Sequence, residues 1–521
     1  MTRRPMRPLL ALLVSPLLLA GCARAAFQYG RDGLAPVDRT VRANLEAGQY
    51  GSAYEASFKQ DAAARDRLLR ALSAGTLGLY ASRTDSSVWA LDRAWALTED
   101  RWSKKVGNAA ASVVTNDYAL PYTPGATERL FIPFYGALSW LSRGARDDAA
   151  VEARRLTQLL GVAPDSGGAT AAGEVRGLLH YVAGAVFEAA GDRTDADVAY
   201  RNAARLVSVP VSRDTTVADS LSGDVVVVLE QGFVGHPVPR DETIWLTRDE
   251  YANLRLDGDD RSFRTANAVL VREGLRGYGP YYGPYYGPTY GPYYPRRRFE
   301  MGVSINWSEF VNGRPVATSV SLAASGAMPA TSLPRPDGNV SRAVSADFER
   351  GQAARFTRAL IRAATRAVLV TAAADQLSKA DGDDRPGGRP RGDRGNGQTS
   401  GSATKPPGPR VGSDIAANGR TVDKEDRASA AGHVLAGLGL FAIAAASDAA
   451  DRPDLRSWNL LPHDLRVMRL RVPAGEQDVR VLVDGQEVIV GHANVRAGQV
   501  TVLAQRLFRS PSRASVIAGD R

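Results

Sequence analysis

The sequence predicts a multidomain α+β protein with an N-terminal helical array, a mixed middle region with long helices, and a small C-terminal antiparallel β unit. Three observations predict this. Alanine, leucine and arginine recur with helical periodicity over residues 37–206. β-branched runs begin after Pro210, and apolar and polar residues alternate over residues 455–508. A chain of 521 residues is long enough for several domains with their own cores.

Residues 1–21 are predicted to be a signal peptide. Three arginines precede an apolar run, Leu9–Ala20, and small residues follow before Cys22. This run is too short to span a bilayer as a mature helix. The Leu-Ala-Gly-Cys ending resembles the bacterial lipobox, which implies cleavage before Cys22 and acylation of its thiol. The alternative is an ordinary secreted protein with a buried or free cysteine.

Cys22 is the one cysteine of the chain, so its acylation leaves no thiol for a disulfide. Residues 22–36 would form the lipidated N-terminal tether. Two or more acyl chains give stable anchoring, and a mature lipoprotein carries three. Ala23, next to the cysteine, resembles the outer-membrane sorting pattern. We therefore expect a lipid-anchored envelope protein, in the outer membrane and facing the periplasm.

The composition disfavours several function classes. The formal net charge of +9 falls to +6 without the signal-peptide arginines, and the excess is not concentrated in a basic block, which disfavours nucleic-acid binding. The five histidines are scattered without metal-ligand spacing. No catalytic constellation stands out, because acidic pairs such as Asp147/Asp148 and Asp259/Asp260 fall in expected turns. We expect no catalysis, metal or cofactor, although a site assembled from distant segments would be invisible here.

Residues 37–206 are predicted to form a helical domain that resembles tetratricopeptide repeats. The best copy spans residues 178–206, with Gly184 and Phe187 in its first helix, Gly191 in the turn, and Ala196, Tyr200 and Ala203 in its second helix. A second copy lies 47 residues earlier, with Ala137, Trp140, Gly144, Ala149 and Ala153 in equivalent places. Weaker copies lie around Gly48 and Gly78. The irregular spacing predicts a helical array, an architecture that typically supplies binding surfaces.

Residues 207–378 are predicted to be a mixed β region with one long helix. The strand candidates are residues 224–232, 243–247, 267–274 and 301–309. The helix is expected over residues 344–377, because apolar residues recur at helical spacing. These are Phe356, Leu360, Ala363, Ala367 and Val370.

Two features of this region are candidate interaction surfaces. An arginine row on the long helix could meet phospholipid headgroups or an acidic partner; it consists of Arg355, Arg358, Arg362 and Arg366. A solvated helix face is the favoured alternative. The Gly/Pro/Tyr tract at residues 277–295 includes Tyr281, Tyr282, Tyr285 and Tyr286, which could stack on sugar rings. The favoured alternative there is a solvated low-complexity insertion.

The rest of the chain contains a linker, a helix and a β unit. Residues 379–427 lack large apolar residues and are expected to be a disordered linker. Residues 428–450 are long enough to cross a membrane, but their alanine and glycine content favours a buried helix. In the C-terminal β unit, residues 455–508, Asp484-Gly485 predicts a hairpin turn. Residues 509–521 are expected to be a loose tail.

The order of these motifs resembles a bacterial family of periplasmic lipoproteins with tetratricopeptide-like helices. The resemblance rests on the Cys22 lipobox, residues 116–141 and 149–156, the strand at 225–232, and residues 456–475. It implies an anchored, non-enzymatic interaction scaffold of the cell envelope. Its partners would be the lipid bilayer, through Cys22, and an unidentified envelope protein. Binding of peptidoglycan or polysaccharide by the tyrosine tract is the alternative.

Overall fold

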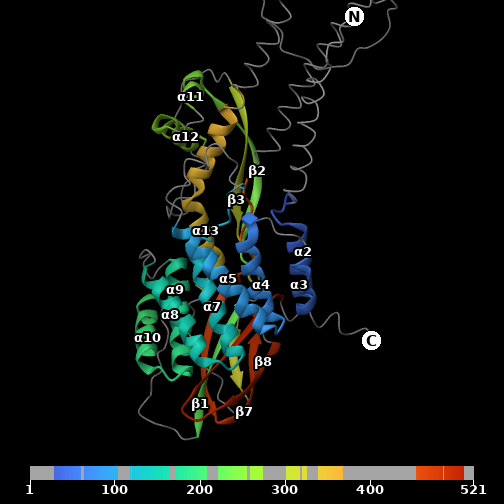
Figure 1. Cartoon of the computed structure of the whole chain (residues 1–521), viewed down its shortest axis with the longest axis vertical. Helices are drawn as coiled ribbons and strands as arrows, with labels where there is room; N and C mark the ends of the chain where they lie inside the picture. Colours follow the sequence, from blue (N-terminus) through green and yellow to red (C-terminus); the bar gives the residue numbers. More distant parts are fainter. Residues whose placement is uncertain are drawn as a thin grey trace, which may run out of the picture. The chain divides into compact units, whose positions relative to one another are not determined.

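The computed structural model describes residues 29–59, 64–103, 118, 120–162, 170–207, 221–254, 259–273, 301–316, 320–324, 338–365, 367, 453–484 and 486–509. The chain divides into two compact units, Met1–Ala364 with Asp451–Arg521, and Thr365–Ala450. In the second unit only Thr365 and Ala367 are described. The first unit is mixed α+β (Figure 1).

The N-terminal part of this unit is helical. Its helices are α2 (Pro36–Glu46), α3 (Tyr50–Ala56), α4 (Arg67–Tyr80), α5 (Thr84–Ser103), α7 (Ala126–Ser142), α8 (Arg146–Val162), α9 (Ala171–Ala189) and α10 (Arg193–Leu206), with the 3₁₀ turn η1 (Ala64–Asp66) before α4. α4 and α5, α7 and α8, and α9 and α10 pack as consecutive pairs. α5 also packs on α7, and α8 on α9, so the pairs stack in chain order.

Each helix pair is joined by a short turn whose middle residue has a positive φ. These residues are Ser82 (57°), Gly144 (77°) and Gly191 (86°). In each turn the following residue donates its backbone N–H to a carbonyl five positions earlier: Arg83 to Gly78, Ala145 to Trp140, and Asp192 to Phe187. This bond satisfies a carbonyl at the helix end. The predicted turn positions of Gly144 and Gly191 are confirmed.

Small residues let the paired helices approach closely. A Cβ on Gly184 of α9 would lie 2.8 Å from the ring of Tyr200 on α10. Similarly, a Cβ on Gly75 of α4 would lie 2.5 Å from the side chain of Leu91 on α5. Real Cβ atoms do not approach other atoms so closely, so each contact requires glycine.

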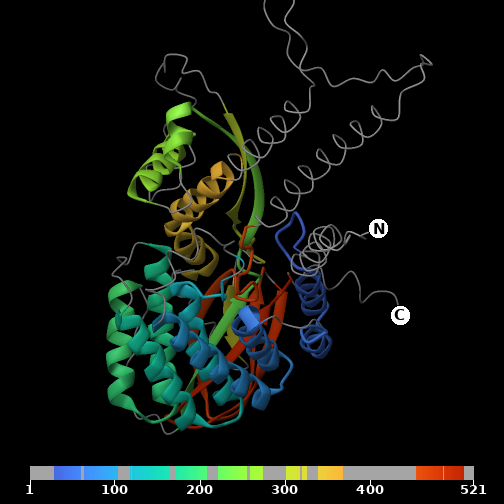
Figure 2. The same ribbon diagram turned by 45° about the horizontal axis from the view of Figure 1, so that its top comes forward.

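The middle and C-terminal segments together build a four-stranded sheet. Its order is β5 (Gly338–Asn339), β6 (Asp464–Pro473), β1 (Ser222–Gln231) and β9 (Val500–Leu507). β1 is antiparallel to β6 and parallel to β9. Figure 2 shows the green β1 among the red C-terminal strands. β1 is buried from Gly223 to Gln231, which confirms the buried strand expected at residues 224–232.

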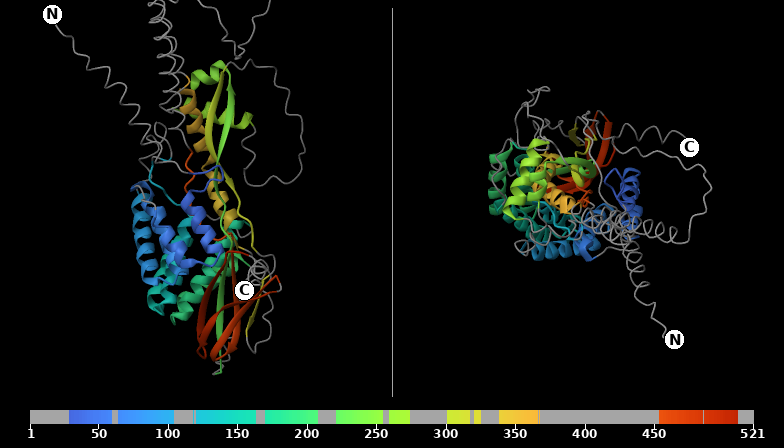
Figure 3. Two further views of the ribbon diagram at one scale, coloured as in Figure 1. Left: turned by 90° about the vertical axis from the view of Figure 1, so that its right-hand side faces the viewer. Right: turned by 90° about the horizontal axis from the view of Figure 1, so that it is seen from above.

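A second sheet packs on the first and completes a sandwich. It consists of β4 (Val320–Ala324), β7 (Gly475–Val483) and β8 (Gln486–Val495), in that order. Valines of β7 belong to the same sandwich core as Val225, Val227 and Leu229 of β1. The opposite face of β1, with Val226 and Val228, packs in the core of the helical layer. The helices therefore cover one face of the first sheet and the second sheet covers the other (Figure 3).

The expected C-terminal β unit is not self-contained. The hairpin at Asp484 is present, with φ of 47° at that residue. However, β1 and β4 come from the middle region, and β9 is parallel to its neighbour. The reason is that β1 is apolar on both faces and needs hydrogen-bonding partners on both edges to be buried.

A two-stranded ribbon and two short helices also belong to the middle region. β2 (His236–Leu246) pairs antiparallel with β3 (Met301–Val311), and α11 (Arg248–Asn253) and α12 (Asp260–Arg272) follow β2. These strands confirm two strand candidates. The strand expected at residues 267–274 is wrong, because those residues largely belong to α12. Asp259 caps that helix by accepting the Ser262 N–H, and burial at Ala266, Val269 and Leu270 follows the helical period.

The expected long helix is broken at Gly351. α13 (Val340–Arg350) begins at a cap made by Asn339, and a separate helical run covers residues 352–365. Phe356, Leu360 and Ala363 of the predicted stripe are buried, and Ala367 is half-buried. Val370, the linker at 379–427, the helix expected at 428–450 and the tail at 509–521 lie outside the described residues, apart from Arg509. Among the helices that the structure describes, none is both long and apolar enough to span a membrane.

Candidate binding pocket

The described residues include only some of the candidate site residues that the sequence predicts. Cys22, Arg366 and the four named tyrosines of the 277–295 tract lie outside the described residues. Arg362 is only 8% exposed, and Arg355 and Arg358 are half-buried. The Arg355 guanidinium lies 3.7 Å from the ring centre of Phe348 and donates to the Phe348 carbonyl. The favoured solvated-face interpretation is therefore wrong for Arg362, because burial extends around the helical run.

No metal centre forms within the described ranges, where no three histidine, cysteine or acidic side chains gather. His180 on α9 is buried and its Nδ1 has no hydrogen-bond partner. Burial lowers the pKa of His180 to about 4, and nearby Arg176 adds to this effect. His463 instead pairs with the carboxylate of Asp464 at 2.8 Å.

A buried polar network ties the helices to the first sheet. The Oε2 atom of Glu230 on β1 accepts the Tyr80 hydroxyl at 2.6 Å, and its Oε1 atom accepts the Tyr135 hydroxyl at 2.6 Å. Arg506 on β9 donates to the Tyr80 hydroxyl at 2.9 Å and lies 3.9 Å from Glu230. We call these four residues the Tyr–Glu–Arg network. It joins α4, α7, β1 and β9.

The buried surroundings shift the pKa of Tyr135 and the pKa of Arg506. Burial and the Glu230 carboxylate raise the pKa of Tyr135, so its phenol stays protonated. Burial alone would lower the pKa of Arg506, but Tyr80, Tyr135 and Glu230 raise it overall. Arg506 also donates to the carbonyls of Gly232 (2.7 Å) and Leu461 (2.9 Å). Both Glu230 oxygens accept a phenol, so the arrangement holds Tyr80 and Tyr135 in position.

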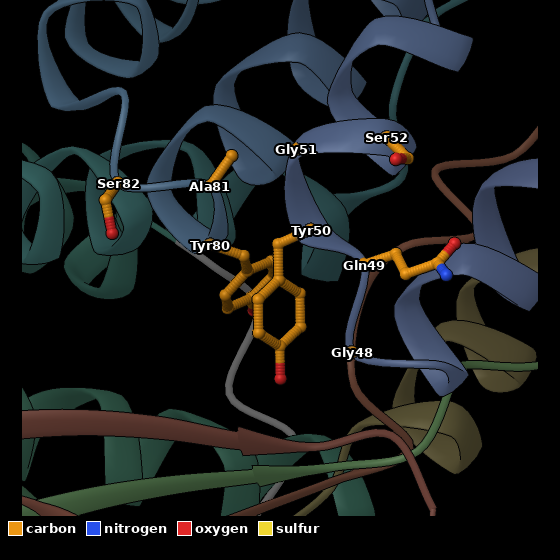
Figure 4. A pocket seen from close by; sticks show the side chains of 8 residues that line it. All are labelled: Gly48, Gln49, Tyr50, Gly51, Ser52, Tyr80, Ala81 and Ser82. Carbon is orange, nitrogen blue, oxygen red and sulfur yellow. The ribbon is translucent and has the colours of Figure 1, made fainter.

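Tyr80 also lines a pocket of about 550 Å³. The pocket lies between the turn from α2 to α3 and the turn from α4 to α5 (Figure 4). It is open to solvent, and its lining consists of Gly48, Gln49, Tyr50, Gly51, Ser52, Tyr80, Ala81 and Ser82. In Figure 4 the side chains of Tyr50 and Tyr80, from the start of α3 and the end of α4, both extend toward the middle of the lining residues.

The rings of Tyr50 and Tyr80 both pack against the ring of Phe508, the residue after β9. The ring centre of Tyr80 lies 5.5 Å from that of Phe508 in an edge-to-face arrangement, and Tyr50 lies 6.0 Å away. The Arg506 guanidinium lies 4.9 Å from the Phe508 ring centre. Aromatic and cation–π contacts of this kind add to the stability of apolar packing. The C-terminal strand therefore supports a pocket made by N-terminal helices.

Sequence reasoning missed this site. Glu230 lies in a strand that the sequence predicts, on the same face as Val226 and Val228. A carboxylate on an otherwise apolar face of that strand was the one sequence feature that could have indicated a buried polar site. Nothing local indicated that Arg506 would lie on the adjacent strand. The pocket residues lie in two turns and in the ends of α3 and α4 next to them, which only tertiary packing brings together.

A second buried ionic cluster lies between the sheet and the helix pair α9–α10. Arg469 on β6 pairs with Glu188 on α9 and with Asp224 on β1, and Tyr200 on α10 donates to Glu188 at 2.7 Å. Arg471 lies 3.1 Å from Asp224. This cluster fixes α9 and α10 to the sheet, as the Tyr–Glu–Arg network fixes α4 and α7.

Comparison with protein-family models, curated proteins and solved structures found no match to this chain.

Proposed function

We propose that this protein is a lipid-anchored interaction scaffold of the bacterial cell envelope, held through Cys22 in the outer membrane and facing the periplasm. In this proposal it performs no catalysis, and a tetratricopeptide-like array of three helix pairs, α4–α5, α7–α8 and α9–α10, presents the surface for an envelope protein. The signal-like N-terminus supports the anchor. The stacking of the pairs in chain order supports the array.

The face of the array that is available to a partner is its outer layer. The inner helices α4, α7 and α9 are tied to the sheet by Tyr80, Tyr135 and Glu188. The sheet therefore fills the side on which a free-standing array would offer a groove. α5, α8 and α10, the second helices of the pairs, each expose a large apolar side chain: Trp89, Val151 and Val198.

Trp89 on α5 is the observation that carries the proposal. This residue is 72% exposed, although tryptophan is highly buried on average. Salt bridges flank it: Asp85 pairs with Arg143 at 2.8 Å, and Asp92 with Arg155 at 3.2 Å. An exposed tryptophan with a charged rim is typical of the energetic centre of a protein interface.

Photo-crosslinking in intact cells from position 89, followed by mass spectrometry, tests this surface. We expect an envelope protein to be captured there, and Trp89→Ala to remove its co-purification. Trp245→Ala is the matched control, because Trp245 on β2 is 55% exposed and lies outside the array. Equal co-purification with both variants would overturn the proposed surface.

The anchor has a separate test. Cys22→Ala should move the protein from the membrane fraction to the soluble fraction, because no acyl chain can then be attached. Continued tight membrane retention of that variant would contradict the lipid anchor. The alternative function, glycan binding by the tyrosine tract, concerns residues outside the described ones and stays a hypothesis.

A further inference from the structure

We propose that the pocket between the α2–α3 and α4–α5 turns binds an uncharged sugar unit of an oligosaccharide, with Tyr50 and Tyr80 as its stacking platform. This inference goes beyond the scaffold function and does not depend on Trp89 or on the anchor. It also concerns different residues from the tyrosine tract.

The size of the pocket suits a small ligand. Its volume of about 550 Å³ lies within the range of roughly 300–1,000 Å³ that is typical of small-molecule sites. A Cβ added at Gly48 or at Gly51 would meet no atom within 4 Å, so the space next to both residues is open. The open side lets an oligosaccharide extend beyond the one unit that is bound.

The side chains that line the pocket indicate which class of ligand it would bind. Apart from the two phenols it contains no ionisable side chain, so it offers no counter-charge to an anion or a cation. Ala81 is its one aliphatic side chain, which is too little apolar surface for a lipid chain. Aromatic rings, an amide and hydroxyls remain, from Tyr50, Tyr80, Gln49, Ser52 and Ser82. Rings suit the C–H faces of a sugar, and the polar groups suit its hydroxyls.

The Tyr80 ring is held in place before any ligand arrives. Its hydroxyl donates to the Glu230 carboxylate at 2.6 Å and accepts from the Arg506 guanidinium at 2.9 Å. Its ring packs edge-to-face against the ring of Phe508. A side chain that is already ordered loses little conformational entropy on binding. The buried Tyr–Glu–Arg network thus fixes the orientation of the Tyr80 ring on which a ligand would stack.

Tyr50 supplies the polar part of the platform. Its ring is half-buried and lies 6.0 Å from Phe508. Among the described residues its hydroxyl has no hydrogen-bond partner, whereas the Tyr80 hydroxyl is fully occupied. The Tyr50 hydroxyl can therefore donate to, or accept from, a sugar hydroxyl.

The test uses the full chain, purified in a detergent without a sugar headgroup. Three uncharged probes, tetramers of N-acetylglucosamine, of β-1,4-linked glucose and of α-1,4-linked glucose, are titrated at millimolar concentration and followed by saturation-transfer NMR and calorimetry. We expect at least one probe to bind. Tyr50→Ala should weaken that binding by about tenfold or more, which is the effect of losing about 1.4 kcal/mol.

Two further variants keep the result interpretable. Gly51→Leu fills the open space without removing a tyrosine, and leucine is a better helix former than glycine, so the fold should persist while binding is lost. Tyr54→Ala is the matched control, because Tyr54 lies on the same helix but outside the pocket lining, and it should change affinity less than twofold. Thermal unfolding checks that each variant folds.

Three results would overturn the proposal. One is the absence of binding for all three uncharged probes. Another is unchanged binding in the folded Tyr50→Ala or Gly51→Leu proteins. The third is a sulfated oligosaccharide that binds at the pocket more tightly than every uncharged probe, because the lining would then serve an anion.

Discussion

Arg469 on β6 donates hydrogen bonds to both carboxylate oxygens of Glu188 on α9, at 2.9 and 3.1 Å. The same guanidinium donates to Asp224 on β1, and Tyr200 of α10 shares Glu188. One side chain thus connects two strands of the sheet with the last helix pair. Its removal would take away the guanidinium partner of Glu188 and leave Asp224 paired with Arg471.

Arg469→Met should therefore destabilise the protein strongly. Removing one partner of a buried ion pair typically costs about 3–5 kcal/mol. We expect a loss of about 3 kcal/mol in the free energy of unfolding, measured by denaturant titration. Arg480→Met is the control, because Arg480 pairs with Glu487 on an exposed sheet surface and should cost less than about 1 kcal/mol. Equal losses would contradict the structural role of Arg469.

Gly184 and Gly161 should respond to alanine with opposite signs. In Gly184→Ala the new Cβ would lie 2.8 Å from the Tyr200 ring, so α9 and α10 must separate, at a cost of about 1–3 kcal/mol. In Gly161→Ala on α8 the Cβ meets nothing within 4 Å, and the higher helix propensity should stabilise by up to about 1 kcal/mol. Thermal unfolding of both variants checks this, and a destabilised Gly161→Ala would refute the expected packing.

Glu152 should make stability fall as the pH rises. It is buried on α8, and burial raises its pKa to about 7, although Arg155 opposes this rise. A carboxyl group with a raised folded-state pKa stabilises the protein below its unfolded pKa of about 4.5. That stability, up to about 3 kcal/mol, is lost between about pH 4.5 and about pH 7.

Glu152→Gln should flatten this part of the pH profile. We expect the difference in unfolding free energy between about pH 5 and about pH 8 to be smaller in the variant than in the parent protein. Glu55→Gln is the control, because Glu55 is exposed and pairs with Arg83 at the surface. The same pH slope in the parent protein and in Glu152→Gln would show that Glu152 does not titrate in this range.

His180 should act in the opposite direction. Its folded-state pKa of about 4 lies below the ordinary value of 6.5, so its contribution is complete above about pH 6.5. It is lost as the pH falls toward about 4, because the unfolded chain binds the proton more readily. His180→Leu should therefore retain more of its neutral-pH stability at about pH 5 than the parent protein does. Identical acid sensitivity of the two proteins would contradict this expectation.

The fold was predictable wherever the pattern is local. The valine run of β1 indicated a strand that is buried on both faces, and Gly144 and Gly191 marked their turns. The apolar run in α12 was misassigned, because a short run of this kind fits both a strand and a helix. Its cap at Asp259, accepting from Ser262, was the feature that decides between them.

The candidate pocket could not be predicted, because it depends on contacts between distant segments. Tyr50, Tyr80 and Phe508 meet only when β9 lies beside β1, and a strand carries no local mark of its neighbour's identity. The burial of Arg362 in the arginine row was not predictable for the same reason. Its spacing indicated one helix face, but what covers that face is decided by the rest of the fold.

The position of β1 in its sheet also governs the order in which the protein can fold. Asp224 pairs with Val500 on one edge of β1 and with Arg471 on the other. In a chain made from its N-terminus, β1 is therefore complete long before either neighbour exists. Pairings between such distant residues are slow to form, and an unpaired apolar strand is prone to aggregation. The first half of this protein can thus reach its native sheet only after nearly the whole chain has been synthesised.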